Sequence, residues 1–181
     1  MLDRVVVISD DSVVSGGAAM IALASIRGLR SRGVPVTLLT GDSGDNPELR
    51  HLGVDIVALG GMHILEGSPA GAALRGLFCH TVHGRARDWI RRNDTPRTVY
   101  HLHNWHKVLS PSILLALRPV AQRLFLSAHD FFLACPNGGF YDYRAGVACD
   151  RVPMSAGCIA SQCDKRPYAH KLWRVARHAV A

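Results

Sequence analysis

The chain has 181 residues, of which 48% are hydrophobic and 19% charged, and this balance excludes an intrinsically disordered protein. The formal net charge of +7 suits ligands that carry phosphate, but the positive residues are scattered and form no nucleic-acid-binding motif. We therefore expect no nucleic acid partner. No apolar run is long enough to span a membrane and the first residues do not resemble a signal peptide, so we expect a cytoplasmic protein.

Short apolar runs alternate along the chain with longer amphipathic segments. The expected strands are residues 3–9, 34–40, 54–59, 98–102 and 124–128. The expected helices are residues 18–32, 47–52, 68–92, 110–117 and 168–180. Strands and helices that alternate with short joints predict an α/β fold, here a Rossmann-like open parallel sheet with helices on both faces.

The alternating pattern stops after the fifth expected strand. We predict a Rossmann-like N-terminal domain over residues 1–130 and a Cys-rich loop appendage over residues 131–167. Residues 168–181 then form a helix that has no Gly or Pro stop signal, so we expect it to lead toward a further domain.

His129 and Asp130 directly follow the apolar run 124–128, which we expect to be a buried parallel strand. Ligands of open α/β sheets bind beyond the carboxyl ends of the strands. A histidine exchanges protons near neutral pH, and a carboxylate orients the histidine or holds a ligand hydroxyl. The pair is therefore the predicted catalytic group, and the alternative is a turn in which Asp130 satisfies its own backbone.

Gly16 and Gly17 lie between the first expected strand and helix, where glycine lets backbone N–H groups approach a phosphate at the helix N-terminus. The G-x-G-x-x-G fingerprint is absent, which argues against NAD or FAD. A tight turn that needs small residues is the alternative. His103 and Asn104 follow the fourth expected strand, and we expect them to line the same cleft rather than to bind a metal.

Four cysteines fall in or beside the loop-rich segment: Cys135, Cys149, Cys158 and Cys163. In a cytosolic protein such a group predicts a structural zinc ion before disulfides. The spacing lacks a C-x-x-C pair, so four reduced cysteines without metal remain the alternative.

The C-terminal amphipathic helix is basic around Trp173, with Lys171, Arg174 and Arg177. Such a helix is able to dock on an anionic membrane, and we keep peripheral contact with the inner face of the membrane as one possibility. The other possibility is an ordinary helix that covers the sheet.

Several segments taken together resemble one known family. They are D-x-x-x-x-G-G-A at 11–18, RGLRSRGVPVTLLT at 27–40, HLHNW at 101–105 and SAHDFFLACPNGG at 127–139. This set is similar to the N-terminal half of the family-4 glycosyltransferases, and the likeness covers residues 11–180. The segment around AHDFFLACPNGG is its most specific part.

The resemblance implies a GT-B architecture, in which two Rossmann-like domains face each other across a cleft. The N-terminal domain binds the acceptor, the other binds a nucleotide diphosphate sugar, and the chemistry retains the anomeric configuration without a metal cofactor. By position, Gly16 and Gly17 would approach the donor diphosphate. His129 would face the transferred sugar with Asp130 beside it, and His103 and Asn104 would lie near the acceptor path.

The chain also departs from the family pattern. The donor domain of the family carries a pair of glutamates, whereas Glu48 and Glu66 are the only two glutamates here and both precede the fourth expected strand. We therefore expect the donor domain to be supplied in cis or in trans and the isolated chain to be inactive. A C-x-x-C near Cys149, expected by the same resemblance, is also absent.

The expected function is the acceptor-side domain of a retaining hexosyltransferase that acts on a glycan or a lipid-linked acceptor. Two alternatives remain open. One is a non-catalytic module that binds a glycan or a partner subunit, and the other is a zinc-stabilised Cys-rich module on a Rossmann-like domain.

Overall fold

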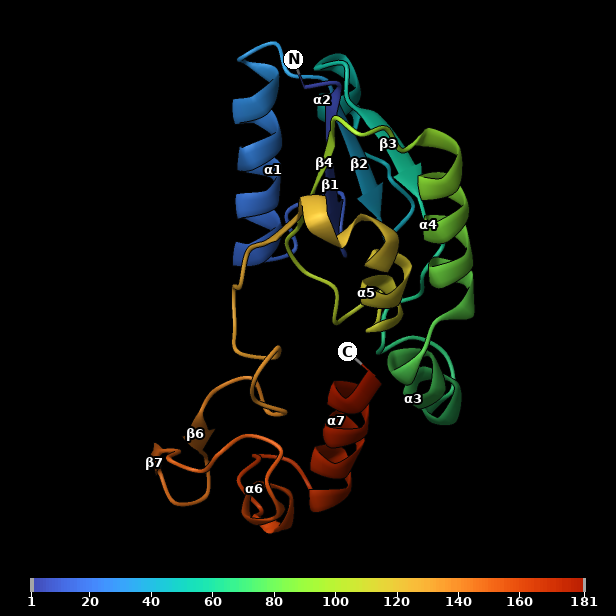
Figure 1. The fold of residues 1–181 in the computed structure, drawn as a ribbon. Helices are drawn as coiled ribbons and strands as arrows, with labels where there is room; N and C mark the ends of the chain where they lie inside the picture. Colours follow the sequence, from blue (N-terminus) through green and yellow to red (C-terminus); the bar gives the residue numbers. More distant parts are fainter. Residues whose placement is uncertain (1, 181) are drawn as a thin grey trace. The chain divides into compact units, whose positions relative to one another are not determined.

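The computed structural model describes residues 2–180 and divides into two compact units (Figure 1). The first unit ends at Ser127, close to the boundary expected at residue 130, and the second begins at Ala128. Helix α7 (Tyr168–Val180) has the expected bounds and belongs to the same unit as Cys135, Cys149, Cys158 and Cys163.

The first unit contains a five-stranded parallel sheet in the order β3-β2-β1-β4-β5. Its strands are β1 (Arg4–Ser9), β2 (Val36–Thr40), β3 (Asp55–Ala58), β4 (Thr98–Leu102) and β5 (Leu124–Leu126). The predicted α/β class and parallel sheet are confirmed. Because the chain runs from β1 outward to β2 and β3 and returns to β4 on the other side, the strand order reverses between β1 and β4.

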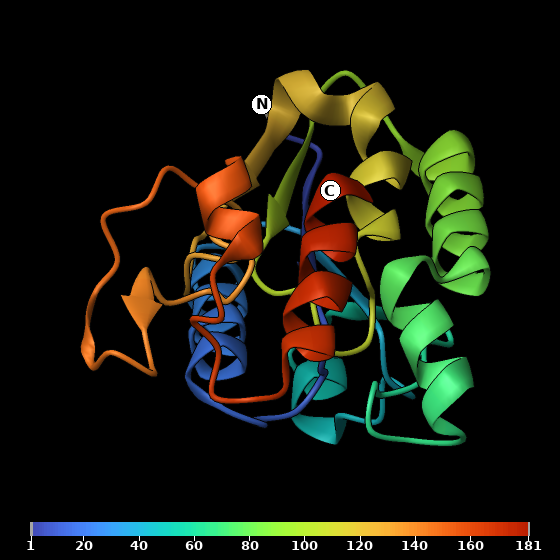
Figure 2. The same ribbon diagram turned by 90° about the horizontal axis from the view of Figure 1, so that it is seen from below.

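Helices cover both faces of this sheet. The helices of the first unit are α1 (Gly17–Arg30), α2 (Pro47–His51), α3 (Pro69–Leu77), α4 (His80–Asn93) and α5 (Ser112–Ala116), with a 3₁₀ helix η1 (Arg118–Arg123) before β5. Figures 1 and 2 both show α1 on one side of the strands and α4 on the other. Val5 and Val7 of β1 form one apolar cluster with Ala22 and Ile26 of α1. Side chains alternate along a strand, so Val6 and Ile8, which are also buried, point to the opposite face.

The single helix expected over residues 68–92 is wrong, because the structure breaks it at Phe78 and Cys79. The backbone N–H of Cys79 donates a hydrogen bond to Ser110 Oγ (3.1 Å). The hydroxyl of Ser112 donates to the Cys79 carbonyl oxygen (3.1 Å). These hydroxyl groups bond the backbone of Cys79 at the junction between α3 and α4.

The last strand also differs from expectation. β5 ends at Leu126 rather than at residue 128, and it lies at the edge of the sheet. The Phe125 side chain is 63% exposed, so β5 is not the buried strand that its apolar sequence predicted. The backbone hydrogen bond from Ser127 N to Leu102 O (2.9 Å) continues the β4–β5 pairing for one further step.

The second unit contains little regular structure. A short hairpin of β6 (Tyr141–Asp142) and β7 (Val147–Ala148) precedes α6 (Ala156–Ala160) and α7. Hydrogen bonds tie α7 to the α6 segment, because the Tyr168 hydroxyl donates to Ile159 O (2.7 Å) and the Lys171 ammonium donates to Cys158 O.

In the first unit, an ion pair between Asp94 and Arg123 joins the end of α4 to η1. Arg123 donates two hydrogen bonds to the Asp94 carboxylate (2.9 and 2.7 Å), and the Tyr100 hydroxyl donates a third (2.9 Å). The bonds from Arg123, and then that from Tyr100, hold the pKa of Asp94 below its ordinary value although partial burial acts in the opposite direction. Burial, followed by the bond to Asp94, raises the pKa of Tyr100.

This network predicts an acid-sensitive contribution to stability. The folded pKa of Asp94 lies below the unfolded value of about 4, so its stabilisation is present above that pH and is lost as the pH falls through the folded pKa. Asp94→Asn should lower the urea midpoint at neutral pH and narrow the difference between the neutral and acidic midpoints. Asp88→Asn, at an exposed ion pair on the same helix, is the matched control. Equal acid sensitivity in the wild type and in Asp94→Asn would contradict this account.

Candidate functional site

The carboxyl edge of the sheet is held together by the Asp10 carboxylate. Asp10 follows β1 and is completely buried. Its Oδ1 accepts hydrogen bonds from the backbone N–H groups of Val108 (2.9 Å) and Leu109 (2.8 Å), and its Oδ2 accepts one from Lys107 (2.9 Å). The segment that follows β4 is thereby fixed to the end of β1, at the point where the strand order reverses.

Val108 then packs against the loops that follow β2 and β3. A Cβ atom added to Gly41 or to Gly61 would lie 2.7 Å from Val108 Cγ1, closer than real side chains approach. The two loops are also joined directly by a hydrogen bond from Gly61 N to Gly41 O (2.9 Å). Glycine is required at both positions because the three loops meet so closely, and their meeting point forms one wall of a cleft.

This cleft, of about 300 Å³, opens beyond the carboxyl ends of β1, β2 and β3. Its lining residues are Asp11, Asp42, Ser43, Gly61, His63, Glu66 and Val108. It occupies the edge at which ligands bind in open α/β sheets. None of its polar side chains belongs to the site predicted from the sequence.

The Asp42 carboxylate is fully engaged by the protein. Its Oδ2 accepts from the backbone N–H (2.7 Å) and hydroxyl (2.8 Å) of Ser12, and its Oδ1 accepts from the Thr40 hydroxyl (2.7 Å) and Gly44 N–H (3.0 Å). Asp42 therefore positions the loop after β1 instead of meeting a ligand. Asp11 is only partly buried, and its carboxylate accepts a hydrogen bond from the Ser15 hydroxyl.

His63 and Glu66 complete the cleft from the segment after β3. The His63 Nδ1 accepts a hydrogen bond from the backbone N–H of Leu65 (3.2 Å), which in the neutral ring leaves the proton on Nε2. Glu66 is exposed. The cleft thus offers carboxylate acceptors and one imidazole, a set that favours hydroxyl or ammonium donors and disfavours phosphate.

The structure places Gly16 and Gly17 in open space at the start of α1. A Cβ added at either position would meet no described atom within 4 Å, and no side chain in the described chain caps this helix. Packing within the chain therefore gives no reason for small residues here, unlike at Gly41 and Gly61. The exposed N–H groups at the helix start remain able to meet an anion.

His103 and Asn104 lie at the same edge but inside the protein. Their exposed fractions are 3% and 5%, respectively. Asn104 Oδ1 accepts hydrogen bonds from the Ser9 hydroxyl (2.7 Å) and from Asp10 N–H (3.2 Å), so Asn104 bridges the ends of β4 and β1. The His103 ring packs against that of His101, with centroids 4.1 Å apart. In this conformation both side chains are part of the packed interior at the carboxyl edge of the sheet.

His129 and Asp130 belong to the second unit, beyond the end of β5. His129 is exposed, and Asp130 Oδ1 accepts a hydrogen bond from the backbone N–H of Phe132 (3.0 Å). Asp130 thus forms the local turn that the sequence offered as the alternative to a catalytic role. The residues predicted to bind the donor or the acceptor, Gly16, Gly17, His103 and Asn104, all belong to the first unit.

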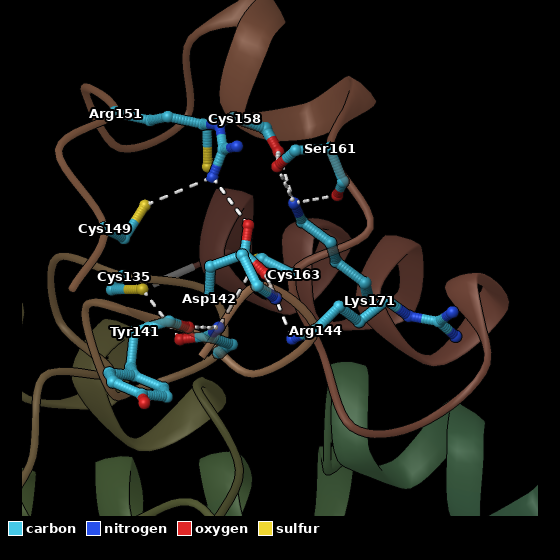
Figure 3. A network of polar contacts seen from close by, with 12 residues as sticks. Cys135, Tyr141, Asp142, Arg144, Cys149, Arg151, Cys158, Ser161, Cys163 and Lys171 are labelled. Atoms are coloured by element: carbon cyan, nitrogen blue, oxygen red, sulfur yellow. Dashed lines mark hydrogen bonds and ion pairs between the residues drawn. The ribbon is translucent and has the colours of Figure 1, made fainter. Parts of the chain in front are cut away.

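The four predicted zinc ligands all lie in the second unit as free cysteines (Figure 3). Cys135 Sγ donates a hydrogen bond to Asn137 Oδ1 (3.0 Å), and the same amide donates to Cys163 Sγ (3.4 Å). Arg151 donates to Cys149 Sγ (3.7 Å). Within residues 2–180, no three His, Cys, Asp or Glu side chains are grouped closely enough to hold a metal ion.

The basic residues of α7 are used inside the second unit. Lys171 and Arg177 are buried, and Arg174 forms an ion pair with Asp164 (2.5 Å). These three cations therefore do not form the exposed basic face on which the suggestion of membrane docking rested. Among the described helices, none combines the length and the apolar character needed to cross a membrane.

Comparisons of the chain with protein-family models, with curated proteins and with solved structures give no match.

The sequence motifs did not identify Asp10, Asp11, Asp42 or His63. Each follows the end of a strand by one to five residues, and this position is the signal that could have identified them. The roles of Asp10 and Asp42 depend on partners that only the folded chain brings near.

The buried Asp10 carboxylate gives a direct stability prediction. Asp10→Asn replaces an acceptor oxygen with an NH₂ group that faces backbone N–H donors, so the free energy of unfolding should fall by about 2–4 kcal/mol. Asp45→Asn, whose carboxylate is 78% exposed beside Arg50, should leave the free energy of unfolding nearly unchanged. Urea denaturation measures both. An Asp10→Asn protein as stable as the wild type would show that other contacts hold residues 107–109.

Proposed function

We propose that this chain is the acceptor-side domain of a retaining glycosyltransferase of GT-B type. The enzyme moves a hexose from a nucleotide diphosphate sugar to a glycan or a lipid-linked acceptor, and its donor domain is supplied in cis or in trans. The observation that carries the proposal is the acidic cleft at the carboxyl edge of a Rossmann-like sheet, beside a helix start that has two open glycines.

The chemistry of the cleft fits a polyhydroxylated acceptor. Carboxylates such as Asp11 and Glu66 accept hydrogen bonds from hydroxyl groups. His63 accepts a hydrogen bond from Leu65 N–H at Nδ1, so its Nε2–H group can donate to a hydroxyl oxygen. The same negative charge repels a diphosphate. The acceptor therefore belongs in the cleft, and the donor phosphates belong at the backbone N–H groups of Gly16 and Gly17 and on the donor domain.

In this proposal His129 makes the contact with the transferred sugar. It is exposed at the start of the second unit, and the turn that carries it is shaped by the bond between Asp130 and Phe132 N–H. Its imidazole holds a sugar hydroxyl during transfer. The rate comes from positioning and from electrostatic stabilisation of an oxocarbenium-like state, without a metal cofactor.

Binding measurements on the purified chain test the proposal. Saturation-transfer NMR should detect neutral hexose oligosaccharides, while UDP and GDP should bind weakly because the donor domain supplies most of their contacts. Asp11→Asn combined with Glu66→Gln should weaken saccharide binding by about tenfold or more, since each removes a charged acceptor.

Asp45→Asn is the matched control, because it removes an exposed carboxylate outside the cleft. Tight binding of NAD or of a free nucleotide, with no saccharide binding, would contradict the proposal. Saccharide binding that survives the double substitution would place the acceptor elsewhere on the chain.

A further inference from the structure

The outer strand β3 has one side that pairs with no strand of the described chain. It lies at the end of the order β3-β2-β1-β4-β5, and its register with β2 places Ala58 opposite Thr40. In this register the backbone bond from Leu59 N to Thr40 O (2.8 Å) means that residues 55, 57 and 59 direct their N–H and C=O groups toward β2. Ile56 and Ala58 therefore direct theirs to the free side.

The sequence of β3 does little to block pairing on that side. Natural edge strands are commonly protected by Pro, by Lys or by a β-bulge. The four residues of β3, DIVA, include neither Pro nor Lys, and their register with β2 is continuous. The free side is therefore short but able to accept another strand.

A groove of about 240 Å³ lies between β3 and α4, which Figure 1 shows side by side. Its walls include Val57 and Ala58 from β3 and Arg85, Asp88, Trp89 and Arg92 from α4. A Cβ atom added to Gly60 would lie 2.0 Å from Arg85 Nη1, so this guanidinium lies over the backbone that follows β3. The groove thus has free backbone groups along one wall and a basic helix face along the other.

Positive charge exceeds negative charge on this part of α4. The Asp88 carboxylate is shared by Arg91 (3.6 Å) and Arg92 (3.8 Å), and all three side chains are more than half exposed. Within residues 2–180 no carboxylate forms an ion pair with Arg85. Three guanidinium groups therefore face one carboxylate, and charge complementarity favours an acidic ligand.

The dimensions of the groove fit an extended polypeptide. Arg85 and Arg92 are seven residues apart on α4, which corresponds to about 10 Å along the helix axis. An extended chain rises about 3.3 Å per residue, so a segment of about four residues covers the same length. A phosphate group would meet the guanidinium groups but would have no donor for the carbonyl oxygens of Ile56 and Ala58, whereas a peptide backbone both donates and accepts.

We propose that this groove binds an extended acidic segment of a partner protein, which adds to the sheet as a strand beside β3. The backbone of the segment exchanges hydrogen bonds with Ile56 and Ala58. Its apolar side chains pack on Val57 and Trp89, and its acidic side chains pair with the arginines of α4. No residue lines both this groove and the acidic cleft, so the partner site is separate from the proposed acceptor site.

Selection of random heptapeptides, displayed on phage, against the immobilised full-length chain tests the proposal. We expect the enriched peptides to be rich in Asp and Glu. A labelled synthetic copy should bind in fluorescence anisotropy measurements, with an affinity that falls as salt is raised. Arg85→Gln combined with Arg92→Gln should weaken this binding by about tenfold or more. Arg87→Gln, at an exposed arginine of α4 outside the groove, is the matched control and should leave it unchanged.

N-methylation of the synthetic peptide, one amide at a time, tests the strand pairing without altering the protein. Only amides that face β3 donate to it, so methylation should abolish binding at alternate positions and be tolerated between them. Tolerance at every position, or binding that survives the double substitution, would overturn the proposal. A selection that enriches no acidic peptide would overturn it too. So would a dimer of the chain that is seen in sedimentation and lost in Ala58→Pro, because a second copy would then pair with β3.

Discussion

The first unit depends on one buried carboxylate. Asp10 accepts three backbone N–H groups from the segment after β4, and Asn104 returns from β4 to bond the end of β1. These hydrogen bonds hold Val108 in place. Gly41 after β2 and Gly61 after β3 pack against Val108. The loops at the carboxyl edge are therefore joined into one rim, and the acidic cleft is formed where they meet.

The two units bury different kinds of side chain. The first buries aliphatic side chains on both faces of a parallel sheet, whereas the second buries thiols, carboxylates and the Lys171 ammonium. We also assign different functional contacts to the two units. In our proposal the rim of the first unit presents carboxylates to a hydroxyl-bearing acceptor, and the exposed His129 of the second unit contacts the transferred sugar.

Periodicity predicted the sheet and most helices because continuous apolar runs and i, i+4 spacing are local properties. Periodicity failed where groups that are distant in the sequence determine the backbone conformation or the exposure of a strand. The break at Cys79 depends on hydroxyls more than thirty residues away, and the exposure of Phe125 follows from the edge position of β5. Likewise the role of Asp10 cannot be read from the sequence around it, since its N–H partners lie far along the chain. Position after a strand end pointed to the carboxyl edge of the sheet, but it did not identify the side chains that line the cleft there.

Amide hydrogen exchange at Val108 and Leu109 measures whether the Asp10 carboxylate holds the carboxyl edge of the sheet together. If the Asp10 carboxylate holds these N–H groups, they should exchange as slowly as the amides of β1, although they lie in a segment without regular secondary structure. Exchange as fast as that of the exposed loop around Asp45 would show that the rim is not held by Asp10 and would contradict the account.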